Sequence, residues 1–165
     1  MKPISKRAVQ AALVNVTKSE RSAIGLPAGF GDIDWPLLDF LGWRDPRFPQ
    51  RGYLVRQHVS EMVAVAVSTT GGGLPPGRKA MCSICRAVDS SSAIALFTAR
   101  RAGPAGRRGD SVGTYICSGL DCSAQLRHPT GRIGRARLDT DPDLEATAAS
   151  MLTRLDHFLH TVTTT

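Results

Sequence analysis

Four cysteines in two pairs constrain the fold of this chain more than any other feature. The first pair is Cys82-x2-Cys85, and the second, Cys117-x4-Cys122, follows after thirty-one intervening residues. Two thiolates two residues apart can close on one ion around a tight turn, and a second pair completes a tetrahedron from elsewhere in the fold. The spacing therefore predicts one Zn²⁺ held by all four cysteines. Because no coordination position stays open, we expect this metal to be structural rather than catalytic.

Other uses of paired cysteines fit the sequence less well. A thioredoxin-type redox pair needs a βαβ context and would leave Cys117 and Cys122 without a role. A zinc deaminase needs His-x-Glu and Pro-Cys-x-x-Cys, and the sequence has neither motif. Two disulfides would require export, but the N-terminal apolar stretch is interrupted by Gln10 and Asn15 and is followed by no cleavage site. We therefore expect a cytoplasmic protein.

Runs of apolar and β-branched residues predict a small antiparallel sheet. Residues 53–70 are expected to form two strands around a turn near Val59–Glu61, and residues 92–99 and 111–117 to form two more. The loop AGPAGRRGD between the last two strands contains too much glycine to be expected as a helix. A CxxC turn, a β-hairpin and a short helix over residues 118–127 together indicate a treble-clef arrangement.

Helices are predicted at both ends of the chain. The first covers residues 3–15, and the capping box Thr17-Lys-Ser-Glu20 starts a second that ends at Gly25. Asp141 is expected to cap a long C-terminal helix with Pro142 at its first position. Its apolar stripe is expected to be core or a dimer interface; the members are Leu144, Ala148, Met151, Leu152, Leu155, Phe158, Leu159 and Val162.

The segment 26–52, rich in proline, is interpreted as a mostly irregular wrap that packs on the core through Trp35, Leu38, Phe40, Leu41 and Trp43. Residues 71–79 are a connector, and residues 130–139 a basic loop or short strand. At 165 residues, the chain fits one ordinary domain. We expect a helical and irregular N-terminal part, 1–52, and a zinc-binding part, 53–165, in one compact unit. The predicted class is α+β: a small antiparallel sheet with a treble-clef-like four-cysteine zinc finger, flanked by N-terminal helices and a long C-terminal helix.

The positive charge is concentrated around the cysteines. The chain has a net charge of +7, and between Arg78 and Arg137 eleven Lys or Arg outnumber three Asp. Four of these residues lie in or beside the glycine-rich loop: Arg100, Arg101, Arg107 and Arg108. Such a patch usually faces an acidic protein or a nucleic-acid backbone; the plainer alternative is that it keeps the protein soluble. No nucleophile–base pair, phosphate loop or dinucleotide motif is visible, and no apolar run approaches a membrane span. We therefore expect neither an enzyme, a small-molecule substrate nor a membrane partner.

Several segments also resemble a known family. They are LDFLGWRDP (38–46), YLV (53–55), MCSIC (81–85), FTARRAG (97–103) and GDSVGTYICSGLDCS (109–123). These segments resemble the actinobacterial members of the elongation factor G-binding protein family. That family includes the fusidic acid resistance proteins, and its C-terminal part is a four-cysteine treble-clef zinc finger. The resemblance extends from about Asn15 to the end of the chain.

The resemblance implies a non-enzymatic zinc protein that binds translation elongation factor G and modulates its release from the ribosome. By position, the four cysteines are the zinc ligands, Tyr115 is the first candidate for the factor-binding surface, and Met81 stands where relatives carry an aromatic residue. With the arginines, the predicted partner-binding set is Met81, Arg100, Arg101, Arg107, Arg108 and Tyr115. The alternative is a zinc module that binds ribosomal RNA or the ribosome directly. Few aromatics accompany the arginines, which favours the protein partner.

Overall fold

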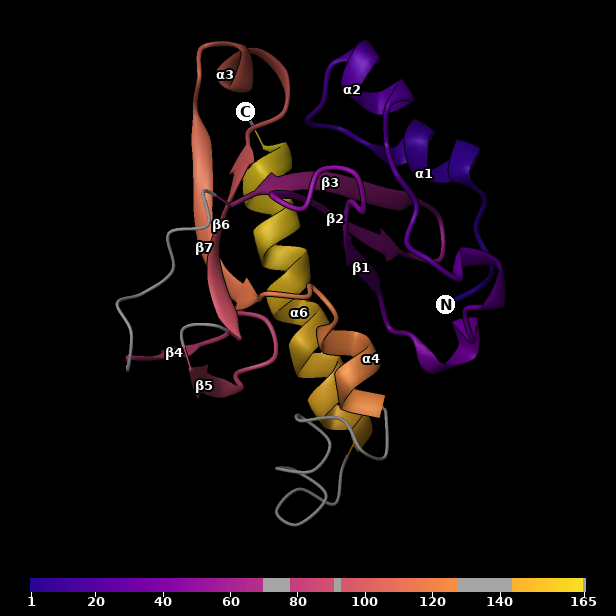
Figure 1. Ribbon diagram of the computed structural model, residues 1–165, viewed down its shortest axis with the longest axis vertical. Helices are drawn as coiled ribbons and strands as arrows, with labels where there is room; N and C mark the ends of the chain where they lie inside the picture. Colours follow the sequence, from indigo (N-terminus) through magenta and orange to yellow (C-terminus); the bar gives the residue numbers. More distant parts are fainter. Residues whose placement is uncertain (70–77, 91–92, 128–143, 165) are drawn as a thin grey trace.

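A five-stranded antiparallel sheet forms the centre of the fold (Figure 1). The computed structural model describes residues 1–69, 78–90, 93–127 and 144–164. The strand order is β1-β2-β3-β6-β7. The strands are β1 (Leu41–Arg44), β2 (Arg51–Gln57), β3 (Met62–Ser68), β6 (Ile94–Arg100) and β7 (Ser111–Cys117). A separate two-stranded sheet pairs β4 (Lys79–Met81) with β5 (Val88–Ser90).

Helices from both ends of the chain and from its second half flank the sheet, which confirms the predicted α+β class. They are α1 (Lys6–Ala12), α2 (Lys18–Ser22), α3 (Gly103–Arg107), α4 (Cys122–Arg127) and the long α6 (Leu144–Thr163). Two short 3-10 turns, η1 (Phe30–Asp32) and η2 (Trp35–Leu37), precede β1. None of the helices in the described residues is long and apolar enough to cross a membrane. The predicted Asp141 cap and the segment 130–139 lie outside the described residues.

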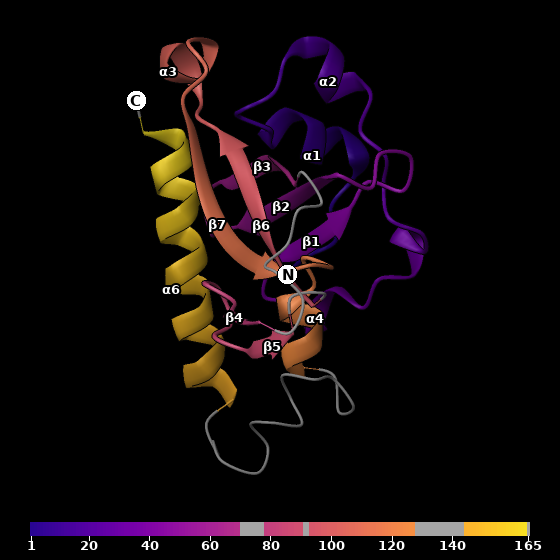
Figure 2. The same ribbon diagram turned by 60° about the vertical axis from the view of Figure 1, so that its left-hand side comes forward.

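The two faces of the sheet are covered by different parts of the chain (Figures 1 and 2). On one face, α6 and the cysteine-bearing segments pack on residues such as Leu54, Val65 and Phe97. On the other, α1 and the segment before β1 pack on Tyr53 and Val55. Adjacent residues of β2 therefore enter opposite cores, because side chains alternate across a strand.

Most predicted core positions are confirmed. Trp35, Phe40, Leu41 and Trp43 are buried, and Leu38 is partly buried. The α6 stripe is core: its buried members are Ala148, Met151, Leu155, Phe158, Leu159 and Val162, with Leu144 and Leu152 partly buried.

The N-terminal elements are shorter or more regular than predicted. The first helix starts after Ser5, whose Oγ accepts a hydrogen bond from Ala8 N at 3.2 Å. It ends at Ala12 because the next residues are extended, and Val14 N donates to Ala64 O at 3.1 Å. The capping box of α2 is present, although the helix ends at Ser22 rather than near Gly25. Within the segment interpreted as irregular, β1 is a true strand.

The expectation that the glycine-rich loop is not helical is wrong. Residues Gly103–Arg107 form α3, with Pro104 in its first turn, where a missing N–H costs nothing. Glycine serves close packing there, since a Cβ on Gly106 would lie 1.7 Å from Arg101 O. The φ of +97° at Gly109 then turns the chain toward β7.

Candidate metal centre

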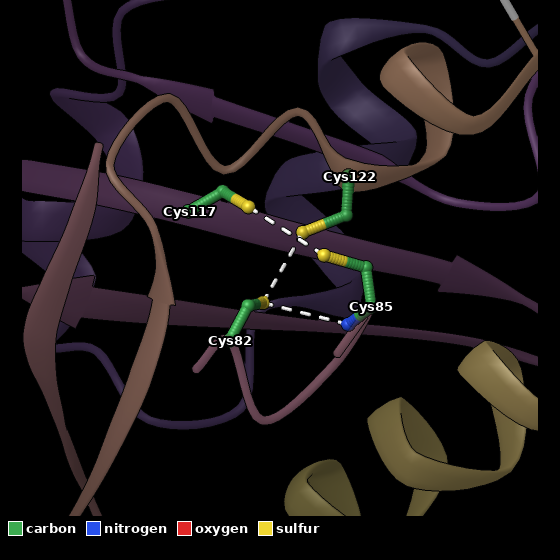
Figure 3. A group of neighbouring side chains, drawn as sticks. All are labelled: Cys82, Cys85, Cys117 and Cys122. Atoms are coloured by element: carbon green, nitrogen blue, oxygen red, sulfur yellow. Dashed lines mark hydrogen bonds between the residues drawn. The ribbon is translucent and has the colours of Figure 1, made fainter. Parts of the chain in front are cut away.

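The four cysteine sulfurs converge on one point between the two sheets and α4 (Figure 3). All four residues are buried, and their Sγ atoms lie within 4.8 Å of one another. Cys82 Sγ is 3.7 Å from Cys122 Sγ, and Cys85 Sγ is 3.6 Å from Cys117 Sγ. A tetrahedral Zn²⁺ with bonds of about 2.3 Å requires sulfur–sulfur distances of about 3.8 Å. The cluster therefore has the dimensions of a four-thiolate zinc site.

The first pair lies in a tight turn between β4 and β5. Cys82 N donates to Ala87 O and Arg86 N donates to Cys82 O, both at 2.9 Å. Cys85 N points back at the Cys82 sulfur at 3.4 Å, a contact that stabilises a thiolate. Arg86 adopts a φ of +65° to complete the turn. The two-residue spacing thus forms the predicted knuckle.

The second pair joins a strand to a helix. Cys117 is the last residue of β7, and Cys122 is the first residue of α4. Between them, Leu120 N donates to Cys117 O at 2.8 Å, and Leu120 takes a φ of +60°. Its side chain is fully buried in the core beside the cysteines, which fixes this unusual backbone. The predicted hairpin-then-helix order of a treble clef is observed.

Hydrogen bonds tie the knuckle to the rest of the fold. Ser83 N donates to Tyr115 O at 2.7 Å, which joins the turn to β7. Arg154 Nε on α6 donates to Ile84 O at 2.6 Å. On the α4 side, Arg127 binds Asp39 Oδ1 at 2.6 Å and Glu145 Oε1 at 2.8 Å. The metal centre is therefore connected to the segment before β1 and to α6.

The electrostatics of the cluster call for a cation. The neighbouring thiols, Cys117 foremost, lower the pKa of the Cys82 thiol and raise the pKa of the Cys122 thiol. A divalent ion bound to all four sulfurs would stabilise the thiolate form of each of them. The four buried cysteines thus hold one structural Zn²⁺.

The predicted partner-binding residues fall into two groups at opposite ends of the β6–β7 hairpin. Ile94 pairs with Cys117 at the zinc end, and Arg100 pairs with Ser111 at the tip. At roughly 3.3 Å per residue, about 20 Å separates these ends. Tyr115 belongs to the zinc end, where Met81 also lies beside the first ligand. The arginines belong to the tip, so the structure does not bring the whole set together.

Two of the four arginines are used within the protein. Arg100 Nη2 donates to both Glu20 carboxylate oxygens at 3.0 and 3.1 Å. Arg101 Nη1 donates to Thr161 O and Thr164 O at 3.0 and 3.1 Å, where the end of α6 presents carbonyls without helical partners. Arg107 and Arg108 are exposed. Arg108 has an exposed, 3.8 Å contact with Asp110.

One side of the hairpin is mostly exposed to solvent, apart from the contact between Arg100 and Glu20. Because Ser68 of β3 pairs with Thr98 of β6, this side of the hairpin belongs to the same face of the sheet as the part of β3 that α1 covers. We call it the hairpin face; its members are Leu96, Thr98, Arg100, Ser111, Gly113 and Tyr115. Leu96 lies opposite Tyr115 and is 38% exposed. Leu96 was not among the site residues predicted from the sequence. Because neighbouring residues of a strand face opposite sides, the adjacent apolar residues Leu96 and Phe97 could not both be on the buried side.

Comparison with known proteins agrees with this architecture. The family model described as the FBP C-terminal treble-clef zinc-finger matches residues 8–162. No curated protein and no solved structure matches the chain significantly. A match over nearly the whole chain, together with four converging cysteines on a knuckle and a helix start, leaves one assignment. The chain belongs to the FBP C-terminal treble-clef zinc-finger family, which confirms the resemblance to the elongation factor G-binding proteins.

Proposed function

We propose that this protein is a non-enzymatic, cytoplasmic binder of translation elongation factor G that modulates release of the factor from the ribosome. The family assignment supports a protein partner of this type. The observation that carries the proposal is the exposure of the hairpin face, where Leu96, Thr98 and Gly113 are exposed, whereas α1 packs on the same side of the sheet over β3. An open sheet face with apolar and polar side chains suits a protein interface.

The zinc end supplies the apolar part of this surface. Leu96 and the partly buried Tyr115 lie side by side on the hairpin face. On the neighbouring knuckle, Met81 is 49% exposed and its cross-strand partner Val88 is 56% exposed. Aromatic residues and methionine are enriched in protein interfaces. The metal holds this region rigid, which lowers the entropy lost on binding.

The tip supplies charge. Arg107 and Arg108 are exposed on and beside α3, and the exposed Arg108–Asp110 contact contributes little stability. Both cations can therefore attract an acidic partner without loss of fold stability. Such charges mainly raise the association rate, and salt screens them.

The decisive experiment measures binding of the purified, zinc-loaded protein to elongation factor G by calorimetry. Leu96→Asp should weaken binding about 30-fold or more, equal to about 2 kcal/mol, because it places a charge in an apolar contact. Val59→Asp is the matched control, since Val59 is a fully exposed residue in the β2–β3 turn. Equal affinities for the two variants would exclude the hairpin face as the contact.

Release is tested by pelleting ribosomes that carry elongation factor G with and without the protein. The protein should move the factor to the supernatant, and Leu96→Asp should abolish this effect. The exposed arginines favour one alternative, direct binding to ribosomal RNA. In that case, the protein would bind factor-free ribosomes with a steep salt dependence, and Arg107→Ala with Arg108→Ala would remove most of the binding.

A further inference from the structure

A second candidate binding site lies away from the hairpin face, between residues 27–38, β1 and α4. It is a groove of about 340 Å³ with mostly apolar walls, to which Ile33, Leu37, Leu41 and Ala124 contribute. This volume falls within the range of about 300–1,000 Å³ typical of ligand sites. Leu37 is 52% exposed on its rim, so a partner can reach the apolar wall directly.

The groove runs along an unpaired edge of the sheet. Since β1 is the first strand in the order, it pairs with β2 alone in the described sheet. Asp45 N donates to Arg51 O at 2.9 Å, in register with the pairing of Arg44 and Gly52. Because hydrogen-bonded pairs alternate in an antiparallel ladder, the backbone groups of Gly42 and Arg44 point away from β2.

Gly42 lines the groove and is partly exposed. Its amide and carbonyl therefore offer one donor and one acceptor to an added strand. Glycine is required at this position for a different reason, because a Cβ would lie 2.1 Å from Leu120 O. At Gly42, the edge of β1 therefore has no side chain beside the apolar walls of the groove.

Two carboxylates and one arginine are the charged residues in the described lining of the groove, in contrast to the basic excess of the protein as a whole. The carboxylates are those of Asp34 and Asp121. Asp34 is exposed, and the buried Oδ1 of Asp121 has no hydrogen-bond partner among the described residues. Among the described residues, Arg127 is the one cation in the lining, and it is already shared between Asp39 and Glu145. An occupant with positive charge is therefore favoured, and nucleic acid is disfavoured.

We propose that this groove binds an extended peptide segment of a partner protein, in which an apolar residue is flanked by Lys or Arg. The segment adds to β1 by pairing with Gly42, as in other cases of strand addition. Its apolar side chain enters the groove, and its basic residue lies near Asp34. The site is separate from the hairpin face, and its test does not depend on elongation factor G.

The test is an NMR titration of the zinc-loaded, full-length ¹⁵N-labelled protein with a terminally blocked nonapeptide. The peptide has leucine at three alternate central positions and lysine on both flanks. A second peptide carries glutamate in place of lysine, and a third carries N-methyl groups on its central amides. The lysine peptide should shift the Gly42 amide resonance and slow its hydrogen exchange. It should bind at least about fivefold more tightly than the glutamate peptide at low salt, and N-methylation should abolish the shift.

Charge reversal at the rim gives the matched variants. Asp34→Lys should weaken the lysine peptide about fivefold and strengthen the glutamate peptide. Asp32→Lys is the control, because Asp32 is an exposed carboxylate of the same segment that does not line the groove. Equal binding of all three peptides, or equal effects of the two variants, would overturn the proposal. So would a Gly42 shift produced by free indole but by no peptide, which would indicate a small-molecule site. A shift that depends on protein concentration alone would indicate a second copy of this chain instead.

Discussion

Asn15 should hold the β6–β7 hairpin onto the rest of the sheet. Within the described residues, the ladder between β3 and β6 pairs Ser68 with Thr98 and no further residues. Asn15 bridges the two strands where the ladder stops. Its Nδ2 donates to Ala66 O at 2.8 Å and to Arg100 O at 2.9 Å, and its Oδ1 accepts from Ala66 N at 2.8 Å. The residue is 6% exposed.

Replacing Asn15 by Ala removes three hydrogen bonds. The amide of Ala66 and the carbonyls of Ala66 and Arg100 then need other hydrogen-bond partners. Each buried group without a partner costs about 1–3 kcal/mol. A polar pocket borders Asn15, Ala66 and Arg100, so water can enter and restore part of this loss. We therefore expect Asn15→Ala to lower the free energy of unfolding by about 2–3 kcal/mol. Amides of β6 and β7 should also exchange faster than those of β1 and β2.

The assay is urea denaturation of zinc-loaded protein, combined with hydrogen exchange. Gln10→Ala is the control, because Gln10 also precedes the sheet but makes one partly buried hydrogen bond, with Arg21 O. Gln10→Ala should lower the free energy of unfolding by less than about 1 kcal/mol. If Asn15→Ala costs no more than Gln10→Ala, or if exchange rises equally in all strands, Asn15 is not the link between the two halves of the sheet.

Three further outcomes are expected. Cys122→Ser, or strong chelation, should remove the metal and unfold the cysteine-bearing part, because structural zinc contributes about 10–16 kcal/mol; retention of near-native circular dichroism without zinc would contradict this. Leu155→Asp should cost about 3–5 kcal/mol in urea denaturation, since it buries a charge at a position that is 0% exposed, whereas the partly buried Leu152 should tolerate Asp better. Despite burial, hydrogen bonds from Gly25 N and Arg47 N lower the pKa of Asp45. Its stabilisation should therefore be complete above the ordinary carboxyl pKa of 3.8 and be lost as the pH falls through the lower folded value. The difference in unfolding free energy between wild type and Asp45→Asn should shrink over that range and not between pH 6 and 8.

The parts of the fold that the sequence predicted are those with strong local signals. The capping box at Thr17, the apolar stripe of α6 and the cysteine spacing each depend on residues close in sequence. The strand β1 was missed because its four residues follow proline-rich chain and gain their pairing from β2, a tertiary effect. The helix α3 was missed because tight packing at Gly106 outweighs the low helix propensity of glycine. We propose that residues 1–52 and 53–165 fold as one unit, since β2 spans that boundary.

The candidate site was predictable where chemistry alone fixes it. Four cysteines leave few alternatives, so the metal ligands could be named from spacing. The roles of the arginines could not be assigned in the same way, because the sequence does not distinguish a cation that binds a partner from one that stabilises the fold. Their roles depend on Glu20, which is 80 residues from Arg100 along the chain, and on the carbonyls at the end of α6.

The division among the arginines explains how the hairpin face is presented. Zinc fixes the base of the hairpin through Cys117, while Arg100 and Arg101 hold its tip to α2 and to the end of α6. Truncating all four arginines would therefore perturb the tip itself and could not isolate a binding role. Truncating Arg107 and Arg108 alone spares both anchors. If Arg107 and Arg108 contact the partner, this double variant should lose partner affinity while its urea denaturation stays unchanged. Parallel losses of affinity and of stability would mean that α3 stabilises the hairpin and takes no direct part in binding.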